Sequence, residues 1–265
     1  MVTEKDLERV LQWFDSYTSS FILDDSVEQS NIQLKIDHSY RVSREITDIG
    51  RSLRLKKAEL FLCEILGLIH DAGRFKQYYK YKTFVDSKSE NHAFLGKKVL
   101  EESGVLRGFP NEDRELLLFA VYHHNFKILP DSASQRNIFF TRLLRDADKL
   151  DIFRVVTEYY ENHEGGANSG IELDLPVSDE ISPSVLEDII NLRIVEISNL
   201  KTSTDFKILQ LGWIFDINFP YTFLSIKERR YIERICATLY DSETKKHVCQ
   251  IISNFIKERS GFLKT

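Results

Sequence analysis

The sequence is poor in the residues that interrupt regular structure, with 5 Pro and 11 Gly among 265 residues. Together with a hydrophobic content of 42%, this scarcity excludes a disordered or collagen-like chain. Cysteine is also scarce, because only Cys63, Cys236 and Cys249 are present. An odd number of cysteines without metal-binding spacing excludes a disulfide scaffold and predicts buried thiols in a reducing compartment.

Long apolar runs and a basic excess are missing as well. The richest apolar run, residues 60–69, is interrupted by Glu64 and is too short to cross a bilayer. Residues 1–20 carry charges where a signal peptide needs an apolar stretch. The formal net charge of -5 argues against a protein that coats nucleic acid or an anionic membrane. We therefore expect a cytoplasmic protein without membrane association or stable nucleic acid binding.

Apolar residues instead recur at helical steps of three and four along most of the chain, and strand alternation is absent. This periodicity predicts an all-α bundle. The one clear interruption is 161–182, which contains Gly-Gly, Asn-Ser-Gly and six acidic side chains without Lys or Arg. It predicts a loop long enough to be a lid or a connector, and an unrelated surface loop stays open as the alternative. We expect a core over 1–160 and C-terminal helices over 183–265 that pack on it, with 204–219 as one central helix.

Five of the seven histidines precede the ends of apolar helices or stand beside small residues: His38, His70, His92, His123 and His124. Imidazole and carboxylate are ligands that first-row divalent metals share, and buried charge in a bundle is tolerated when it is paired or metal-bound. A carboxylate can also bridge two cations. We expect one metal ion to bind His38, His70, Asp71 and Asp148, and a second to bind His92, His123 and His124 with Asp71 shared.

Each of these histidines also has a plainer interpretation as a hydrogen-bonded core residue. Adjacent helical residues point about 100° apart, so the sequence leaves open whether both His123 and His124 are ligands. The His70-Asp71 pair is expected at a helix end, and Gly73, two residues after Asp71, supports that helix stop. His163 and His247 are expected on the surface.

Five stretches carry a resemblance to a known family. They are HSYRVSREI at 38–46, LGLIHDAGRF at 66–75, ENHAFLGKKVL at 90–100, AVYHHN at 120–125 and RDADKLDIFR at 145–154. Their order resembles the HD-domain superfamily of metal-dependent phosphohydrolases over residues 1–160, which implies an all-α HD-domain helical bundle with additional C-terminal helices.

The additional histidines are similar to the longer ligand set of binuclear HD enzymes, including the HD-GYP cyclic-dinucleotide phosphodiesterases. The GYP element itself is absent, because NFKILP follows His124, so cyclic di-GMP specificity is not implied. The Ala-Asp pair of the family corresponds to Ala147-Asp148, which implies Asp148 as the last ligand with Asp146 in reserve. Asp151, three residues further along the same helix face, could orient a histidine.

The resemblance implies that water attacks a phosphoester of a nucleotide or another small phosphorylated metabolite, assisted by one or two divalent ions (Mn, Fe, Mg, Ni, Co or Zn). Asp71 would bridge the ions, and Arg74 and Lys149 would assist catalysis and contact the phosphate. Lys76 is a further candidate for substrate binding. Arg74 fits a structural ion pair equally well.

Residues 72–98 carry seven basic and two acidic side chains, with Tyr and Phe interleaved. Cations beside aromatic faces suit a nucleotide substrate, although a solvated Lys-rich face explains them too. Two other functions stay open: a mixed-valence di-iron oxygenase of the HD fold, and a non-catalytic module that binds a nucleotide and signals to a partner. A complete ligand set argues against the non-catalytic module. The oligomeric state also stays open, a homo-oligomer included.

Overall fold

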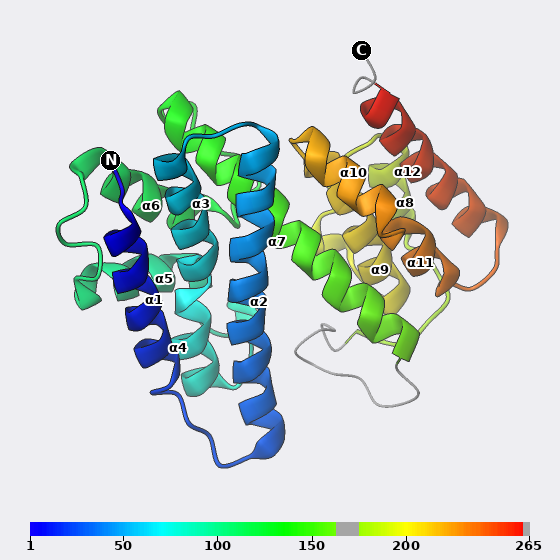
Figure 1. Cartoon of the computed structure of the whole chain (residues 1–265). Helices are drawn as coiled ribbons and strands as arrows, with labels where there is room; N and C mark the ends of the chain where they lie inside the picture. Colours follow the sequence, from blue (N-terminus) through cyan, green and yellow to red (C-terminus); the bar gives the residue numbers. More distant parts are fainter. Residues whose placement is uncertain (163–174, 262–265) are drawn as a thin grey trace. The chain divides into compact units, whose positions relative to one another are not determined.

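The computed structural model describes residues 1–162 and 175–261 and confirms the all-α prediction, since no strand occurs in these ranges (Figure 1). The elements are α1 (Glu4–Thr18), α2 (Ser26–Ser52), α3 (Lys57–Ile69), α4 (Ala72–Tyr81), η1 (Asp86–Lys88), α5 (His92–Ser103), α6 (Asn111–His123), α7 (Gln135–Asn162), α8 (Pro183–Ile190), η2 (Ile197–Asn199), α9 (Ser203–Gly212), η3 (Trp213–Asp216), α10 (Pro220–Glu228), α11 (Tyr231–Ala237) and α12 (Glu243–Gly261).

The chain divides into two compact units, Met1–Asp151 and Ile152–Thr265, and the division falls inside α7. In the first unit α2 packs on α3, α4 packs on α5, and α3 also contacts α1 and α6. In the second unit α12 contacts α8, α10 and α11. Every metal ligand expected from the sequence lies in the first unit. The expected core boundary at residue 160 lies further along α7, and the packing of 183–265 on the core stays a prediction.

Polar side chains fix the starts of the two helices that carry His38 and His92. The Asp25 carboxylate at the N-cap of α2 accepts hydrogen bonds from the backbone N–H groups of Val27 and Glu28, both at 2.8 Å. The Asn91 side chain does the same at the start of α5. Each cap satisfies helical N–H groups that have no partner within the helix. The first residue of α5, His92, is therefore held at a defined helix start.

Two glycines let helices of the first unit approach closely. A Cβ atom added to Gly67 of α3 would lie 2.5 Å from the Cα of Ser43 on α2. One added to Gly73 would lie 2.1 Å from the backbone oxygen of His92, at the start of α5. The expected helix end at the His70-Asp71 pair is confirmed, but Gly73 is not the residue that ends the helix. Helix α3 has already ended at Ile69, and Gly73 lies in the first turn of α4, where its lack of a side chain permits the contact with α5.

The C-terminal unit differs from the sequence expectations in two places. Residues 204–219 do not form one helix, because α9 ends at Gly212 and the short η3 follows. The spacing of Val185, Ile189, Leu192 and Val195 predicts one helix, but α8 ends at Ile190, before Leu192, whose backbone is left-handed with φ 54°. Of the expected acidic loop, residues 161 and 162 end α7 and 175–182 form no helix, whereas 163–174, with His163, lie outside the described residues. His247 on α12 is exposed, as expected.

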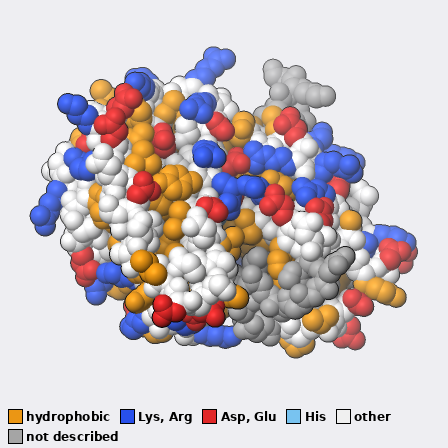
Figure 2. Space-filling view, turned by 60° about the horizontal axis from the view of Figure 1, so that its bottom comes forward, with side chains coloured by type: hydrophobic (Ala, Val, Ile, Leu, Met, Phe, Trp, Pro, Cys, Tyr) orange, Lys and Arg blue, Asp and Glu red, His pale blue; other side chains and the backbone are white. Residues whose placement is uncertain are grey.

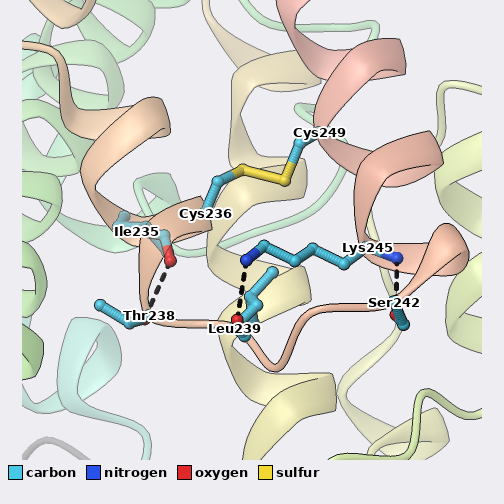
Figure 3. Close-up of a disulfide and its surroundings, with 7 residues drawn as sticks. All are labelled: Ile235, Cys236, Thr238, Leu239, Ser242, Lys245 and Cys249. Atoms are coloured by element: carbon cyan, nitrogen blue, oxygen red, sulfur yellow. Dashed lines mark hydrogen bonds between the residues drawn. A yellow bond between two sulfur atoms is a disulfide. The ribbon is translucent and has the colours of Figure 1, made fainter.

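Two of the cysteines are not thiols, which corrects the expectation from composition. Cys236 of α11 and Cys249 of α12 form a disulfide, with Cα atoms 6.3 Å apart (Figure 3). Both helices belong to the C-terminal unit, and the Lys245 ammonium donates to the Leu239 carbonyl oxygen at 2.9 Å beside the connecting turn. The packing of α11 on α12 brings the two cysteines within reach, which their separation of 13 residues could not indicate. Cys63 is free and buried.

None of the helices in the described ranges is long and apolar enough to span a membrane.

The basic stretch 72–98 is largely neutralised at the surface, since Lys80 pairs with Glu90 at 3.0 Å and Lys82 pairs with Glu28 at 2.8 Å. Figure 2 shows Lys and Arg side chains lying among Asp and Glu side chains on the face that it presents. These pairs fit the interpretation of the stretch as a solvated charged face.

Candidate metal centre

The N-terminal unit gathers histidines and aspartates from helices that are far apart in the sequence. His38 lies in the middle of α2, His70 and Asp71 form the junction of α3 and α4, His92 begins α5, His124 follows α6 directly, and Asp148 lies on α7. The four histidines and Asp71 are buried, whereas the Asp148 side chain is 21% exposed. The cluster is therefore closed on most sides, and Asp148 is its most exposed member.

Asp71 lies at the centre of this cluster. Its Oδ2 is 3.7 Å from Nε2 of His38 and 3.7 Å from Nε2 of His70. Its Oδ1 is 3.7 Å from Nε2 of His92 and 3.9 Å from Nε2 of His124. Each carboxylate oxygen thus faces its own pair of imidazoles, and each pair with Asp71 could hold a metal ion.

We call His38, His70, Asp71 and Asp148 the first group, and Asp71, His92 and His124 the second group. In the first group Asp148 Oδ1 is 3.1 Å from Nε2 of His38 and 3.7 Å from Nε2 of His70. In the second group the two Nε2 atoms are 3.0 Å apart. Donor atoms about 2.1 Å from one ion at ordinary coordination angles lie about 3 to 4 Å from one another. The spacing in both groups therefore fits a divalent metal ion.

The other ring nitrogen of each histidine is fixed by an acceptor. Nδ1 of His38 bonds to Asp151 Oδ2 and Nδ1 of His92 bonds to Asp86 Oδ2, both at 2.7 Å. Nδ1 of His70 and of His124 bonds at 2.7 Å to the backbone oxygen three residues earlier, that of Gly67 and of Val121. Ionised carboxylates and carbonyls only accept, so the proton of each neutral ring is on Nδ1 and its Nε2 carries a lone pair.

These lone pairs point at one another and at carboxylates. Nε2 of His38 and Nε2 of His70 are buried and make no hydrogen bond. Nε2 of His92 and Nε2 of His124 face each other at 3.0 Å with both Nδ1 protons directed elsewhere. Buried acceptors that lack a donor cost free energy. A cation between them would remove that cost, so the residues present fit a divalent metal in both groups.

The electrostatics keep both carboxylates ionised. Burial acts to raise the pKa of Asp71, but the Lys35 ammonium, His70, Arg74 and His92 hold it well below its usual value. Burial likewise acts to raise the pKa of Asp148, but the interactions with the neighbouring His38 and His70 hold it well below its usual value. Two carboxylates that remain charged near neutral pH are what a cation site requires.

The histidines of the two groups differ in the direction of their pKa shifts. Burial, with the neighbouring His92 and His70, lowers the pKa of His124 to about 3, and burial together with Arg74 lowers the pKa of His92. Burial and Lys35 act to lower the pKa of His38, but its aspartate neighbours outweigh them and raise it. The histidines of the second group are therefore neutral, the form in which imidazole binds a metal.

His123, an expected ligand, lies outside both groups. It is the last residue of α6, and its ring packs against Phe119 with the ring centroids 4.0 Å apart. Its Nδ1 bonds to the Phe119 backbone oxygen at 2.9 Å. Successive residues of a helix are rotated by about 100°, so the turn that directs His124 inward directs its neighbour away. The other six expected ligands lie together.

The expected phosphate contacts are placed differently from one another. The Nη1 of Arg74 donates to Gln77 Oε1 at 2.9 Å and pairs with Asp86 Oδ1 at 3.0 Å, which is the structural ion pair left open by the sequence. Lys149 is half-buried beside Asp148 on α7. Lys76 is exposed with its Nζ 3.3 Å from Glu102 Oε2, and it lines a surface pocket that includes none of the expected ligands. Asp146 is buried and belongs to neither group.

Sequence reasoning missed two residues that touch the centre. The Lys35 ammonium lies 2.9 Å from Asp71 Oδ2, and Lys35 precedes His38 by three residues, so the helical repeat places both on one face of α2. Asp86 orients His92 from the loop between α4 and α5, a role that no helical spacing indicates. The orienting role expected for Asp151 is confirmed by its bond to His38, and Arg41 Nε in turn donates to Asp151 Oδ1 at 2.6 Å.

Comparison with known families agrees with this geometry. Residues 36–152 match the family model described as the HD domain. The matched range contains all members of both groups and ends one residue after Asp151. No curated protein and no solved structure gives a significant match to the chain.

Proposed function

We propose that the protein is a phosphohydrolase with two divalent metal ions. Residues 36–152 match the HD domain, which is typical of a superfamily of metal-dependent hydrolases. Its substrate in this proposal is a nucleotide or another small phosphorylated metabolite. The single observation that carries the proposal is the position of Asp71, whose two oxygens face separate pairs of histidines with bare Nε2 atoms.

The chemistry of such a centre suits phosphoester hydrolysis. A bound pair of divalent ions lowers the pKa of a water molecule and offsets the charge of the phosphoryl group. The protein has to hold the ions at a fixed separation, and Asp71 is placed to do so because one rigid carboxylate faces both groups. In this proposal water and substrate approach the centre past Asp148, its most exposed member.

Cationic side chains complete the proposed site. Lys35 is 18% exposed, lies 2.9 Å from Asp71 Oδ2 and has its Nζ 5.4 Å from the centre of the Phe84 ring. With metal bound, Asp71 would share its charge with the ions, and the Lys35 ammonium would be available to a phosphate oxygen. Lys149 keeps its expected role as a second phosphate contact. Arg74 acts in this proposal through Asp86, and Lys76 has no role at the metal centre.

A nucleotide is favoured among phosphorylated metabolites because Lys35 and Phe84 offer a cation beside an aromatic ring. Other aromatic residues of the expected stacking stretch are less suited, since Tyr78 is buried and its hydroxyl accepts from Asn31. A cytoplasmic location remains part of the proposal. The disulfide between Cys236 and Cys249 favours an oxidising environment instead.

The mixed-valence di-iron oxygenase is the second candidate, because four imidazoles around a central carboxylate also suit iron. A non-catalytic module is less favoured, since both groups retain complete sets of candidate ligand atoms with orienting partners. The two enzymes differ in what they need: only the oxygenase requires a redox-active metal and dioxygen.

The proposal is tested on protein purified without chelator. Metal analysis should give two ions per chain, and a panel of nucleotides and sugar phosphates incubated with Mn²⁺, Co²⁺ or Mg²⁺ should release phosphate or a phosphomonoester from at least one member. Removal of the metal with EDTA should abolish the release, and added Mn²⁺ should restore it. A mixed-valence iron signal in electron paramagnetic resonance without phosphate release would support the oxygenase, and absence of bound metal would overturn both.

A further inference from the structure

A buried amide joins the loop between α4 and α5 to the second group. The Gln77 side chain on α4 is completely buried. Its Nε2 has three acceptors at 2.8 Å, namely Asp86 Oδ1, Ser89 Oγ and the Glu90 backbone oxygen. Its Oε1 accepts from Arg74 Nη1 at 2.9 Å. The amide therefore contacts α4 with its oxygen and the loop with its nitrogen.

Asp86 is the link between this amide and the metal-ligand candidates. Its carboxylate accepts from Gln77 and Arg74 on one side and from Nδ1 of His92 on the other, at 2.7 Å to Oδ2. Asp86 belongs to the short η1 helix, and its side chain is 30% exposed. A carboxylate that lies near solvent on a 3₁₀ helix of three residues is held by little regular structure, so its direction depends on the groups that donate to it.

We propose that Gln77 is a positioning residue for the second metal position: it fixes Asp86, and Asp86 holds His92 with its Nε2 aimed at Asp71. The inference rests on the proposed two-metal centre. In this proposal Gln77 binds no metal itself and acts through Asp86. Helix α4 thereby contributes twice, since Asp71 at its N-cap is the shared ligand and Gln77 supports the histidine on the far side of the second group.

The chemistry of the position requires an amide. The oxygen must accept from the Arg74 guanidinium, which has only donors, and the nitrogen must donate to the Asp86 carboxylate. Glutamate would keep the acceptor but would set a second carboxylate against Asp86. Methionine has a similar volume and removes both functions.

The test measures the affinity of each metal position in the full-length protein, by titration of metal-free protein with Mn²⁺ or Co²⁺. We expect Gln77→Met to weaken the second ion ten- to a hundred-fold and to leave the first ion unchanged. We expect Gln77→Glu to weaken it at least as much. In an Asp86→Ala background, Gln77→Met should cause no further loss, because the path from Gln77 to His92 is already broken.

If Gln77 had a purely structural role, its replacement would lower the melting temperature without weakening the second ion selectively. Gln210 of the C-terminal unit is an equally buried glutamine whose Oε1 accepts from the Tyr160 hydroxyl at 2.8 Å, and Gln210→Met is the matched control. It should lower the melting temperature without changing either metal affinity.

Three results would overturn the inference. Gln77→Met could leave the second ion unchanged, weaken both ions equally, or weaken the second ion as strongly in Asp86→Ala protein as in the wild type. Uptake of only one ion by the wild type would overturn the two-metal proposal and this inference together, whereas the three variant results overturn the inference alone.

Discussion

The two groups of metal-ligand candidates follow one plan but differ in what supports them. In each group one histidine donates to a carboxylate that is paired with an arginine, as His38 does to Asp151 and His92 does to Asp86. The other histidine of each group donates to the backbone oxygen three residues earlier in its own chain segment. A backbone oxygen of the preceding helical turn and a carboxylate are thus two partners that can fix the same ring nitrogen, Nδ1.

The support is firmer in the first group. Asp151 lies on α7, is 1% exposed and stands three residues from Asp148, so one helix fixes the ligand and its partner together. Asp86 lies on a loop, is 30% exposed and depends on Gln77 and Arg74. The first group also has Asp148 as an additional carboxylate. The difference predicts that the first ion binds more tightly and that the second exchanges more readily.

The largest effect is expected where the groups meet. Asp71→Ala should abolish binding of both ions and lower phosphoester hydrolysis at least about 1000-fold, since a metal centre contributes several kcal/mol and each 1.36 kcal/mol is tenfold in rate. Metal analysis and initial rates measure both effects. Asp37→Ala, at an exposed aspartate of α2, is the control and should retain both. A variant Asp71→Ala with full activity would show that the centre is not where the reaction occurs.

The next largest effect is expected at His124, and it should distinguish this residue of the second group from the adjacent His123. His124→Ala should remove the second ion and lower the rate about 100-fold or more, while the first ion stays bound. His123→Ala should keep both ions, because the ring of His123 packs on Phe119. Metal-to-protein ratios by mass spectrometry distinguish the two variants. The opposite assignment would make His123 the ligand and contradict the comparison.

The orienting carboxylates test the plan that the groups share. Asp151→Asn should weaken the first ion and Asp86→Asn the second, each about ten- to a hundred-fold, because the amide orients the imidazole less firmly than a carboxylate. Titration with Mn²⁺ followed by electron paramagnetic resonance gives the two affinities. The comparison would fail if either variant weakened both ions to the same extent.

Glycine substitutions at the two close helix contacts test the difference between the groups through helix packing. Gly73→Ala should force α4 and α5 apart and destabilise the metal-free protein by about 1 to 3 kcal/mol, with the second ion weakened more than the first. Gly67→Ala, at the contact of α3 with α2, should destabilise comparably and weaken the first ion more. Denaturant unfolding gives the stabilities. Equal loss of both ions in both variants would mean that the groups are not independent of each other.

The smallest effect on metal is expected in the C-terminal unit. Reduction of the disulfide between Cys236 and Cys249 should leave both ions bound. A thiol reagent should then count two reactive groups in the native protein, against none before reduction, because burial raises the pKa of the Cys63 thiol to about 12. A change in metal content on reduction would show that the second unit bears on the centre.

Helical periodicity and residue chemistry are enough to predict the fold class and most of the side chains that the structure gathers around Asp71. The apolar repeats predict an all-α fold, and the HD-type order of His and Asp predicts ligands that the structure brings together. Periodicity cannot choose between His123 and His124, since the choice depends on the rotation at the last turn of α6. The sequence suggests the wrong role for Gly73 because a helix stop and a close helix contact both favour glycine.

The residues that support the ligands are harder to find from sequence. Asp86 and Gln77 act across a loop whose path follows from tertiary packing, so no fixed spacing links them to His92. Lys35 is within reach of sequence reasoning, because three residues separate it from His38 on one helix face. The disulfide depends on the packing of α11 on α12 and leaves no signal in the spacing of its cysteines.

The two groups form one centre only if Asp71 joins two metal positions. A crystal structure of the protein grown with Mn²⁺, with anomalous scattering used to place the ions, measures this directly. We predict two anomalous peaks on either side of Asp71, one bound by Nε2 of His38 and His70, the other by Nε2 of His92 and His124. Peaks elsewhere in the molecule, with the four Nε2 atoms bound to no ion, would show that Asp71 joins no metal positions.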